Sequence, residues 1–76
     1  MNERQRRAAF RALADLLADR AALRPGLTVD AAADLAFLIT SAENYLVATR
    51  VLCWSPQRWQ RTTTAQLTGA LLGPTT

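Results

Sequence analysis

The side chains of this chain that could do chemistry are few, and histidine is missing altogether. Without histidine, the 76 residues cannot assemble a Ser-His-Asp or Cys-His nucleophile system. Zinc sites usually draw four ligands from Cys, His and carboxylates, and Cys53 is the one cysteine. Three glycines, at positions 26, 69 and 73, cannot build a phosphate-binding loop. We therefore expect no catalytic residues, no metal ligands and no cofactor, and we predict that the protein is not an enzyme.

Charged side chains in helical register are the remaining candidates. Asp15/Asp19 and Asp30/Asp34 are carboxylate pairs at i, i+4, and we interpret them as solvated faces rather than as a cation site. A row of arginines could follow a phosphate backbone. A solvated face explains that row better, because Asp15 and Asp19 continue the same stripe and partly neutralise it. The basic residues of the stripe are Arg4, Arg7 and Arg11, with Arg6 adjacent.

The single cysteine and the absence of a long apolar run bear on the compartment. One cysteine excludes an internal disulfide, which fits a reducing cytosol. No apolar run approaches the ~20 residues needed to cross a bilayer, and the N-terminal residues show no cleavable signal pattern. We expect a cytoplasmic protein without a membrane partner. Cys53 itself is interpreted as a turn residue, with a redox-sensing thiolate near Arg50 as the alternative.

Length and composition indicate one small domain. At 8.3 kDa, a folded chain exposes roughly 4,600 Å² of the roughly 12,000 Å² of its unfolded form. Half of the residues are apolar and 20% are charged, which is a globular composition. The net charge of +3 and the pI of about 10.5 come from nine arginines and no lysine. Two domains, or an architecture of enzyme size such as a barrel, are excluded.

The elements that position these residues are all helical. Apolar residues at helical spacing predict helices over about 3–23, 29–40, 42–52 and 56–72, and no segment alternates with the period of a strand. The expected fold is all-α, a small bundle of three to four helices in a single domain over residues 1–76. In the first segment a wide apolar stripe suggests contact with more than one neighbouring helix. Its members are Phe10, Leu13, Ala14, Leu17 and Ala21.

Turn and cap residues punctuate these helices. Pro25-Gly26 predicts a type II turn after the first segment, with a positive φ at the glycine. Thr28, Ser41 and Ser55 are the expected N-caps, and Pro56 occupies the first helical position after Ser55. Gly73-Pro74 is expected to end the last helix. Propensity leaves open whether residues 29–52 form two helices or one kinked helix.

Several of these strings together resemble the C-terminal end of TetR-family transcriptional regulators. They cover most of the chain, from about position 6 to 72. Two differences from the family pattern are that Cys53 replaces a common glycine, at a helix end suited to the left-handed conformation, and that Ala31 stands where a glutamate would complete a capping box with Thr28. The strings are Leu23-Arg24-Pro25-Gly26-Leu27-Thr28-Val29-Asp30, Ala32-Ala33-Asp34-Leu35, Leu38, Thr40-Ser41, Glu43-Asn44-Tyr45 and Trp54-Ser55-Pro56 with Trp59.

The resemblance implies a dimerisation and partial effector-binding module without the helix-turn-helix domain that family members carry. Two copies would pair their final helices into an intersubunit four-helix bundle, or one copy would pair with a full-length relative. The expected dimer interface is Leu46, Trp59, Thr63, Leu67, Ala70 and Leu71. Candidates for a pocket that binds a small-molecule effector are Phe37, Tyr45 and Trp54, although packing is the commoner role of such aromatic residues. No specific DNA contact is expected from this chain.

Two further hypotheses come from the residues alone. A free-standing basic helical protein would bind nucleic acid through the arginine face, with an affinity that falls steeply with salt. A structural or antitoxin-like protein would need a cognate chain that the sequence does not name.

Overall fold

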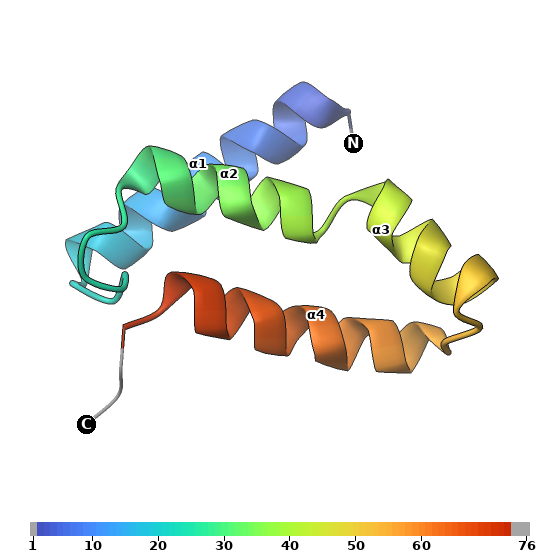
Figure 1. Cartoon of the computed structure of the whole chain (residues 1–76). Helices are drawn as coiled ribbons and strands as arrows, with labels where there is room; N and C mark the ends of the chain where they lie inside the picture. Colours follow the sequence, from blue (N-terminus) through green and yellow to red (C-terminus); the bar gives the residue numbers. More distant parts are fainter. Residues whose placement is uncertain (1, 74–76) are drawn as a thin grey trace.

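The structure is a computed structural model, and it describes residues 2–73. Within that range the chain is all-α, as predicted, and has no named strand. The helices are α1 (Glu3–Asp19), α2 (Val29–Ile39), α3 (Ala42–Leu46) and α4 (Pro56–Leu71), and a π-helical turn, η1 (Val47–Val51), directly continues α3. Helix α2 packs against both α1 and α4, and α3 with η1 lies beyond the C-terminal end of α2 (Figure 1).

The predicted caps begin the helices where expected. The hydroxyl oxygens of Thr28, Ser41 and Ser55 each accept a hydrogen bond from a backbone N–H three residues later. Because Ser41 is extended between α2 and α3, residues 29–52 form separate helices rather than one kinked helix. Gly26 has a φ of 84°, and Leu27 N–H donates to the Arg24 carbonyl, which confirms the expected turn. Pro74, the expected stop after α4, lies outside the described residues.

The predicted end of the first helix, near position 23, is wrong. Helix α1 ends at Asp19 because Ala21 adopts the left-handed conformation, with a φ of 53°. The N–H of Ala22 then donates to the Leu17 carbonyl and that of Ala21 to the Ala18 carbonyl, the pair of bonds of a Schellman motif. Glycine usually occupies this position, so an alanine gave no stop signal in the sequence.

Ending α1 early frees Leu23 to pair with Leu72 in an isolated antiparallel bridge. Arg24 N–H donates to the Leu71 carbonyl at 2.8 Å, and Gly73 N–H donates to the Ala22 carbonyl at 3.0 Å. The bridge fixes the C-terminal end of α4 to the α1–α2 connection. It therefore sets the position of α4 beside α2.

Alanines form most of the core between the helices. The buried cluster consists of Ala14, Ala32, Ala33, Ala36 and Leu71. Alanine lets helices approach closely, but each methyl group buries little apolar area. Larger residues such as Phe10 and Leu67 pack against this cluster and stay only partly buried. No large side chain among the described residues is fully buried.

The molecule is thin and loosely closed as a result. Its Cα atoms span 37 × 32 × 16 Å, with a radius of gyration of 13.3 Å. A compact chain of 76 residues has a radius of gyration of about 11.4 Å. The helices are therefore packed less compactly than is usual for a chain of this length.

Candidate functional site

An apolar groove runs between α1 and α4. Its volume is about 190 Å³, and Thr68 is the one polar residue on its walls. Leu13 of α1 remains 44% exposed on its wall. Leu16, on the same helix, is 46% exposed. This groove is thus an open apolar surface, whose main side chains are Phe10, Leu13, Leu17 and Leu67, while Leu71 lines it but is buried.

A second hollow, which we call the tryptophan hollow, lies between η1 and α4. Its volume is about 250 Å³, and both tryptophans of the chain line it. None of its lining side chains is ionisable, and Thr63 is the only buried polar residue among those described. The residues that line it include Val47, Trp54, Trp59, Thr62, Thr63 and Gln66.

Each indole of the tryptophan hollow is held by a neighbouring side chain. The Arg58 guanidinium lies over the Trp54 ring, 4.3 Å from its centroid. The Tyr45 ring meets Trp59 edge to face, with centroids 4.9 Å apart and an interplanar angle of 90°. Both indoles are therefore positioned before anything binds.

The backbone that presents Trp54 is irregular. In η1 the N–H of Leu52 donates to the Val47 carbonyl, and the N–H of Trp54 reaches the Ala48 carbonyl at 2.9 Å. Cys53, between Leu52 and Trp54, has a φ of 58°, which costs energy for any residue with a Cβ. The family resemblance implied a left-handed helix end here, and Cys53 adopts that conformation despite its Cβ.

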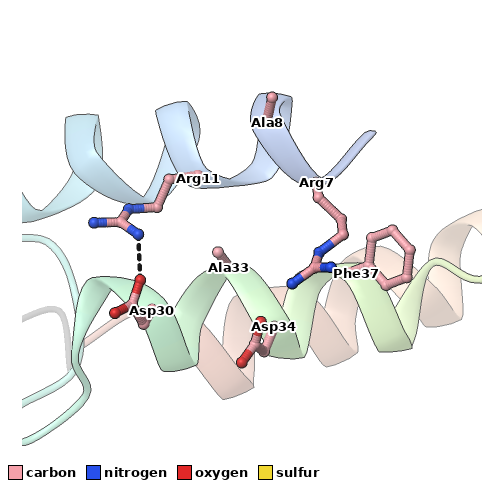
Figure 2. A pocket seen from close by; sticks show the side chains of 7 residues that line it. All are labelled: Arg7, Ala8, Arg11, Asp30, Ala33, Asp34 and Phe37. Atoms are coloured by element: carbon pink, nitrogen blue, oxygen red, sulfur yellow. Dashed lines mark hydrogen bonds and ion pairs between the residues drawn. The ribbon is translucent and has the colours of Figure 1, made fainter. Parts of the chain in front are cut away.

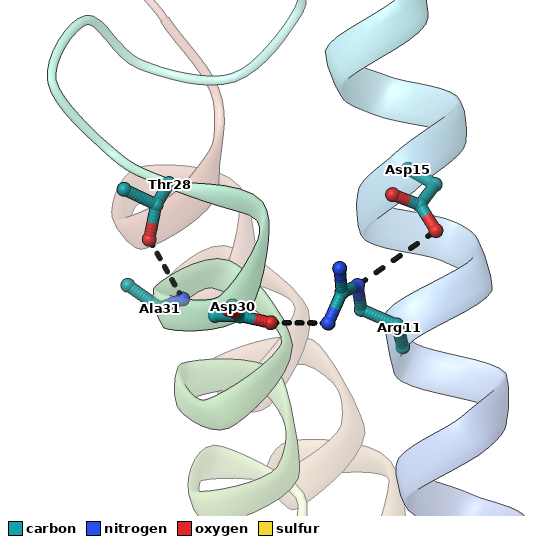
Figure 3. Close-up of polar contacts among 5 residues, drawn as sticks. All are labelled: Arg11, Asp15, Thr28, Asp30 and Ala31. Atoms are coloured by element: carbon teal, nitrogen blue, oxygen red, sulfur yellow. Dashed lines mark hydrogen bonds and ion pairs between the residues drawn. The ribbon is translucent and has the colours of Figure 1, made fainter.

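A third hollow, between α1 and α2, is lined by charges of both signs. Figure 2 shows Arg7 and Arg11 reaching from α1 toward Asp30, Asp34 and Phe37 of α2. Arg11 pairs with Asp30, and its Nε lies 3.8 Å from Oδ2 of Asp15 (Figure 3). Thr28 caps the N-terminal end of α2, where Asp30 lies. These ion pairs are exposed, so they contribute little to stability.

Arg6 crosses from α1 to the C-terminal end of α2. Its Nη2 donates to the Thr40 carbonyl at 3.1 Å and to the Thr40 hydroxyl at 3.0 Å. Its guanidinium also lies over the Phe37 ring, 4.5 Å from the centroid. Arg6 is half-buried against α2, whereas Arg4, Arg7 and Arg11 of the predicted arginine face remain exposed, with Arg11 paired to Asp30.

Comparisons with known proteins give no match: no family model, curated protein or solved structure resembles this chain significantly. Within residues 2–73, no three Cys, Asp or Glu side chains gather as a metal site. Over the same residues, no helix has the length and apolar character needed to span a bilayer.

The three residues expected to line an effector pocket do not share one cavity. Trp54 lines the tryptophan hollow, and Tyr45 supports its other indole from α3. Phe37 instead lines the charged hollow between α1 and α2, where Arg6 covers its ring. Trp59, predicted as an interface residue, lines the tryptophan hollow together with Trp54.

Two residues of the expected dimer interface are buried within the chain. Thr63 is 7% exposed and Leu71 is 6% exposed, because α4 turns this face toward α2 within the chain. Neither side chain is available to a partner. Leu46 is exposed on α3, Ala70 is half-buried, and half-buried Leu67 lines the apolar groove.

Two features that position these sites do not follow from the apolar periodicity of the sequence. Helical register groups Arg6 with the arginines of the solvated stripe, although its guanidinium donates to the Thr40 carbonyl at the end of α2. The helical spacing from Arg6 to Phe10, together with a helix end near Thr40, is a pattern that could have suggested this contact. The apolar periodicity of residues 42–52 does not indicate the π-helical turn.

Proposed function

We propose that this protein is a non-enzymatic, cytoplasmic association module: the dimerisation and partial effector-binding part of a TetR-like transcriptional regulator. A second copy of the chain is the partner. The tryptophan hollow supports the ligand-binding part of this proposal, and the apolar groove supports the pairing part. Regulation would follow from ligand occupancy changing the geometry of the pair.

The observation that carries the pairing part is the amount of surface left open. The chain exposes 5629 Å², about 1,000 Å² more than the roughly 4,600 Å² expected for a folded monomer of its mass. A standard stable interface buries about 800 Å² on each partner. The excess area is therefore enough for one protein–protein interface.

The apolar groove is the pairing surface that this proposal favours. Leu13 and Leu16 stand exposed on α1 at nearly half of their full area, and Leu67 lies across the groove on α4. Around a two-fold axis, α1 of one copy would enter the groove of the other, and each copy would present the same residues. Apolar surface of this kind commonly marks an interface.

Sedimentation equilibrium at tens of micromolar tests the pairing. We expect twice the chain mass of 8.3 kDa. Leu13→Asp should yield monomers, because a carboxylate would be buried against the partner's leucines. Leu38→Asp is the matched control, since Leu38 is an exposed leucine of α2 that does not line the groove.

A monomer for the unmodified chain would overturn the pairing. A dimer that Leu13→Asp leaves intact and Leu38→Asp dissociates would keep the association and move it to another surface.

A further inference from the structure

We propose that the tryptophan hollow binds a small, uncharged aromatic molecule that carries a hydrogen-bonding group. This inference deepens the ligand-binding part of the proposed function, and it does not depend on the pairing part. It concerns the face formed by η1, the following turn and α4, away from the apolar groove.

The chemistry of the walls defines the class of ligand. Two indoles offer flat apolar surfaces on which a planar ring can pack. Thr62 and Gln66 contribute neutral hydrogen-bonding groups from α4. Because no lining side chain is ionisable, a charged ligand would be desolvated against neutral groups, with the Arg58 guanidinium beside them already packed on the Trp54 ring. The hollow between α1 and α2, with its two arginines and two aspartates, has the opposite character.

The size of the hollow limits the ligand to one or two rings. Its volume of about 250 Å³ lies just below the range of ~300–1,000 Å³ that is usual for small-molecule pockets. Apolar lining with a few polar groups is also the usual composition of such pockets.

The walls are held in place before binding, which favours recognition. Arg58 packs on Trp54 and Tyr45 packs on Trp59, so these contacts already restrict both indoles before a ligand enters. The turn that presents Trp54 combines a π-helical turn with a positive φ at Cys53. Both are costly backbone features that occur preferentially at functional sites.

The two tryptophans also provide the measurement. Since Trp54 and Trp59 are the only tryptophans, their two indole N–H signals in a proton–nitrogen correlation spectrum report on this hollow alone. Benzamide is the probe, and benzoate is its charged counterpart of the same shape. For a probe of this size we expect saturation with a dissociation constant of about 1 mM.

Benzamide should shift both indole signals in a saturable way, and benzoate should bind at least about 10-fold more weakly. Gln66→Leu should weaken benzamide binding about 3- to 10-fold through the loss of a hydrogen bond. Gln60→Leu is the matched control, an exposed glutamine of the same helix that does not line the hollow, and it should bind as the unmodified chain does.

Three results would overturn the inference: indole signals that do not saturate with benzamide, equal affinities for benzamide and benzoate, or equal losses in the two glutamine variants. Sedimentation of the same sample tests the pairing separately from the ligand-binding inference. A monomer with saturable benzamide binding contradicts only the pairing, and a dimer without such binding contradicts only the ligand site.

Discussion

The guanidinium of Arg6 on α1 lies against Thr40 at the end of α2 and donates hydrogen bonds to the carbonyl and hydroxyl oxygens of Thr40. A positive charge at a helix C-terminus also interacts favourably with the helix dipole. One side chain thereby joins α1 to α2 at the end of α2 opposite the Thr28 cap.

Replacing Arg6 should destabilise the fold. We expect Arg6→Ala to lower the free energy of unfolding by about 2 kcal/mol, because it removes charge-assisted hydrogen bonds and the contact with the Phe37 ring. Urea unfolding followed by circular dichroism measures this. Arg4→Ala, an exposed arginine of the same helix, is the control and should change the value by less than about 0.5 kcal/mol. Equal effects of the two variants would contradict the role given to Arg6.

The left-handed Ala21 should be improved by glycine. Ala21→Gly should raise the free energy of unfolding by about 0.5–1 kcal/mol, since glycine adopts a φ of 53° without a steric penalty. Ala9→Gly, at an exposed position inside α1, should lower it by a similar amount. Thermal unfolding of both variants gives opposite shifts in Tm if α1 ends at Asp19, and two downward shifts if the helix continues.

Cys53 offers a second test of backbone strain, beside the tryptophan hollow. Cys53→Gly should stabilise the chain by about 0.5–1 kcal/mol, because its φ of 58° suits glycine. Cys53→Ser keeps the Cβ and exposes a similarly small group, so it should leave the stability nearly unchanged. If serine stabilises as much as glycine does, the thiol rather than the backbone is the cause.

The bridge between Leu23 and Leu72 should be visible in hydrogen exchange. The amides of Arg24 and Gly73 donate across it, so both should exchange slowly with solvent deuterium. The amide of Gly26, in the adjacent turn, serves as the comparison and should exchange quickly. Rapid exchange at both Arg24 and Gly73 would show that the end of α4 is not fixed to the α1–α2 connection.

Features encoded locally were predictable from the sequence, and features that depend on distant contacts were not. Thr28, Ser41 and Ser55 begin their helices as expected because a cap involves only the next three residues. The early end of α1 at Ala21 could not be read, since alanine is the strongest helix former.

The candidate sites divide in the same way. The sequence predicts that Trp54 lines a pocket. It also predicts that Phe37 lines the same pocket and that Trp59 lies in an interface, and the structure places these two residues differently. Which aromatic side chains share a hollow depends on how α3 and η1 turn back onto α4, and apolar periodicity carries no information about that turn. The burial of Thr63 and Leu71 within the chain likewise follows from the packing of α4 on α2.

The alanine contact between α1 and α2 determines which substitutions in the core destabilise the fold. Ala32 and Ala36 are 0% and 2% exposed, so truncating either to glycine would remove only one methyl group and leave no sizeable cavity. Enlarging either to valine or leucine would force the helices apart, at a cost of about 1–3 kcal/mol. At these positions of α2, side-chain volume therefore limits which apolar substitutions the protein can accumulate.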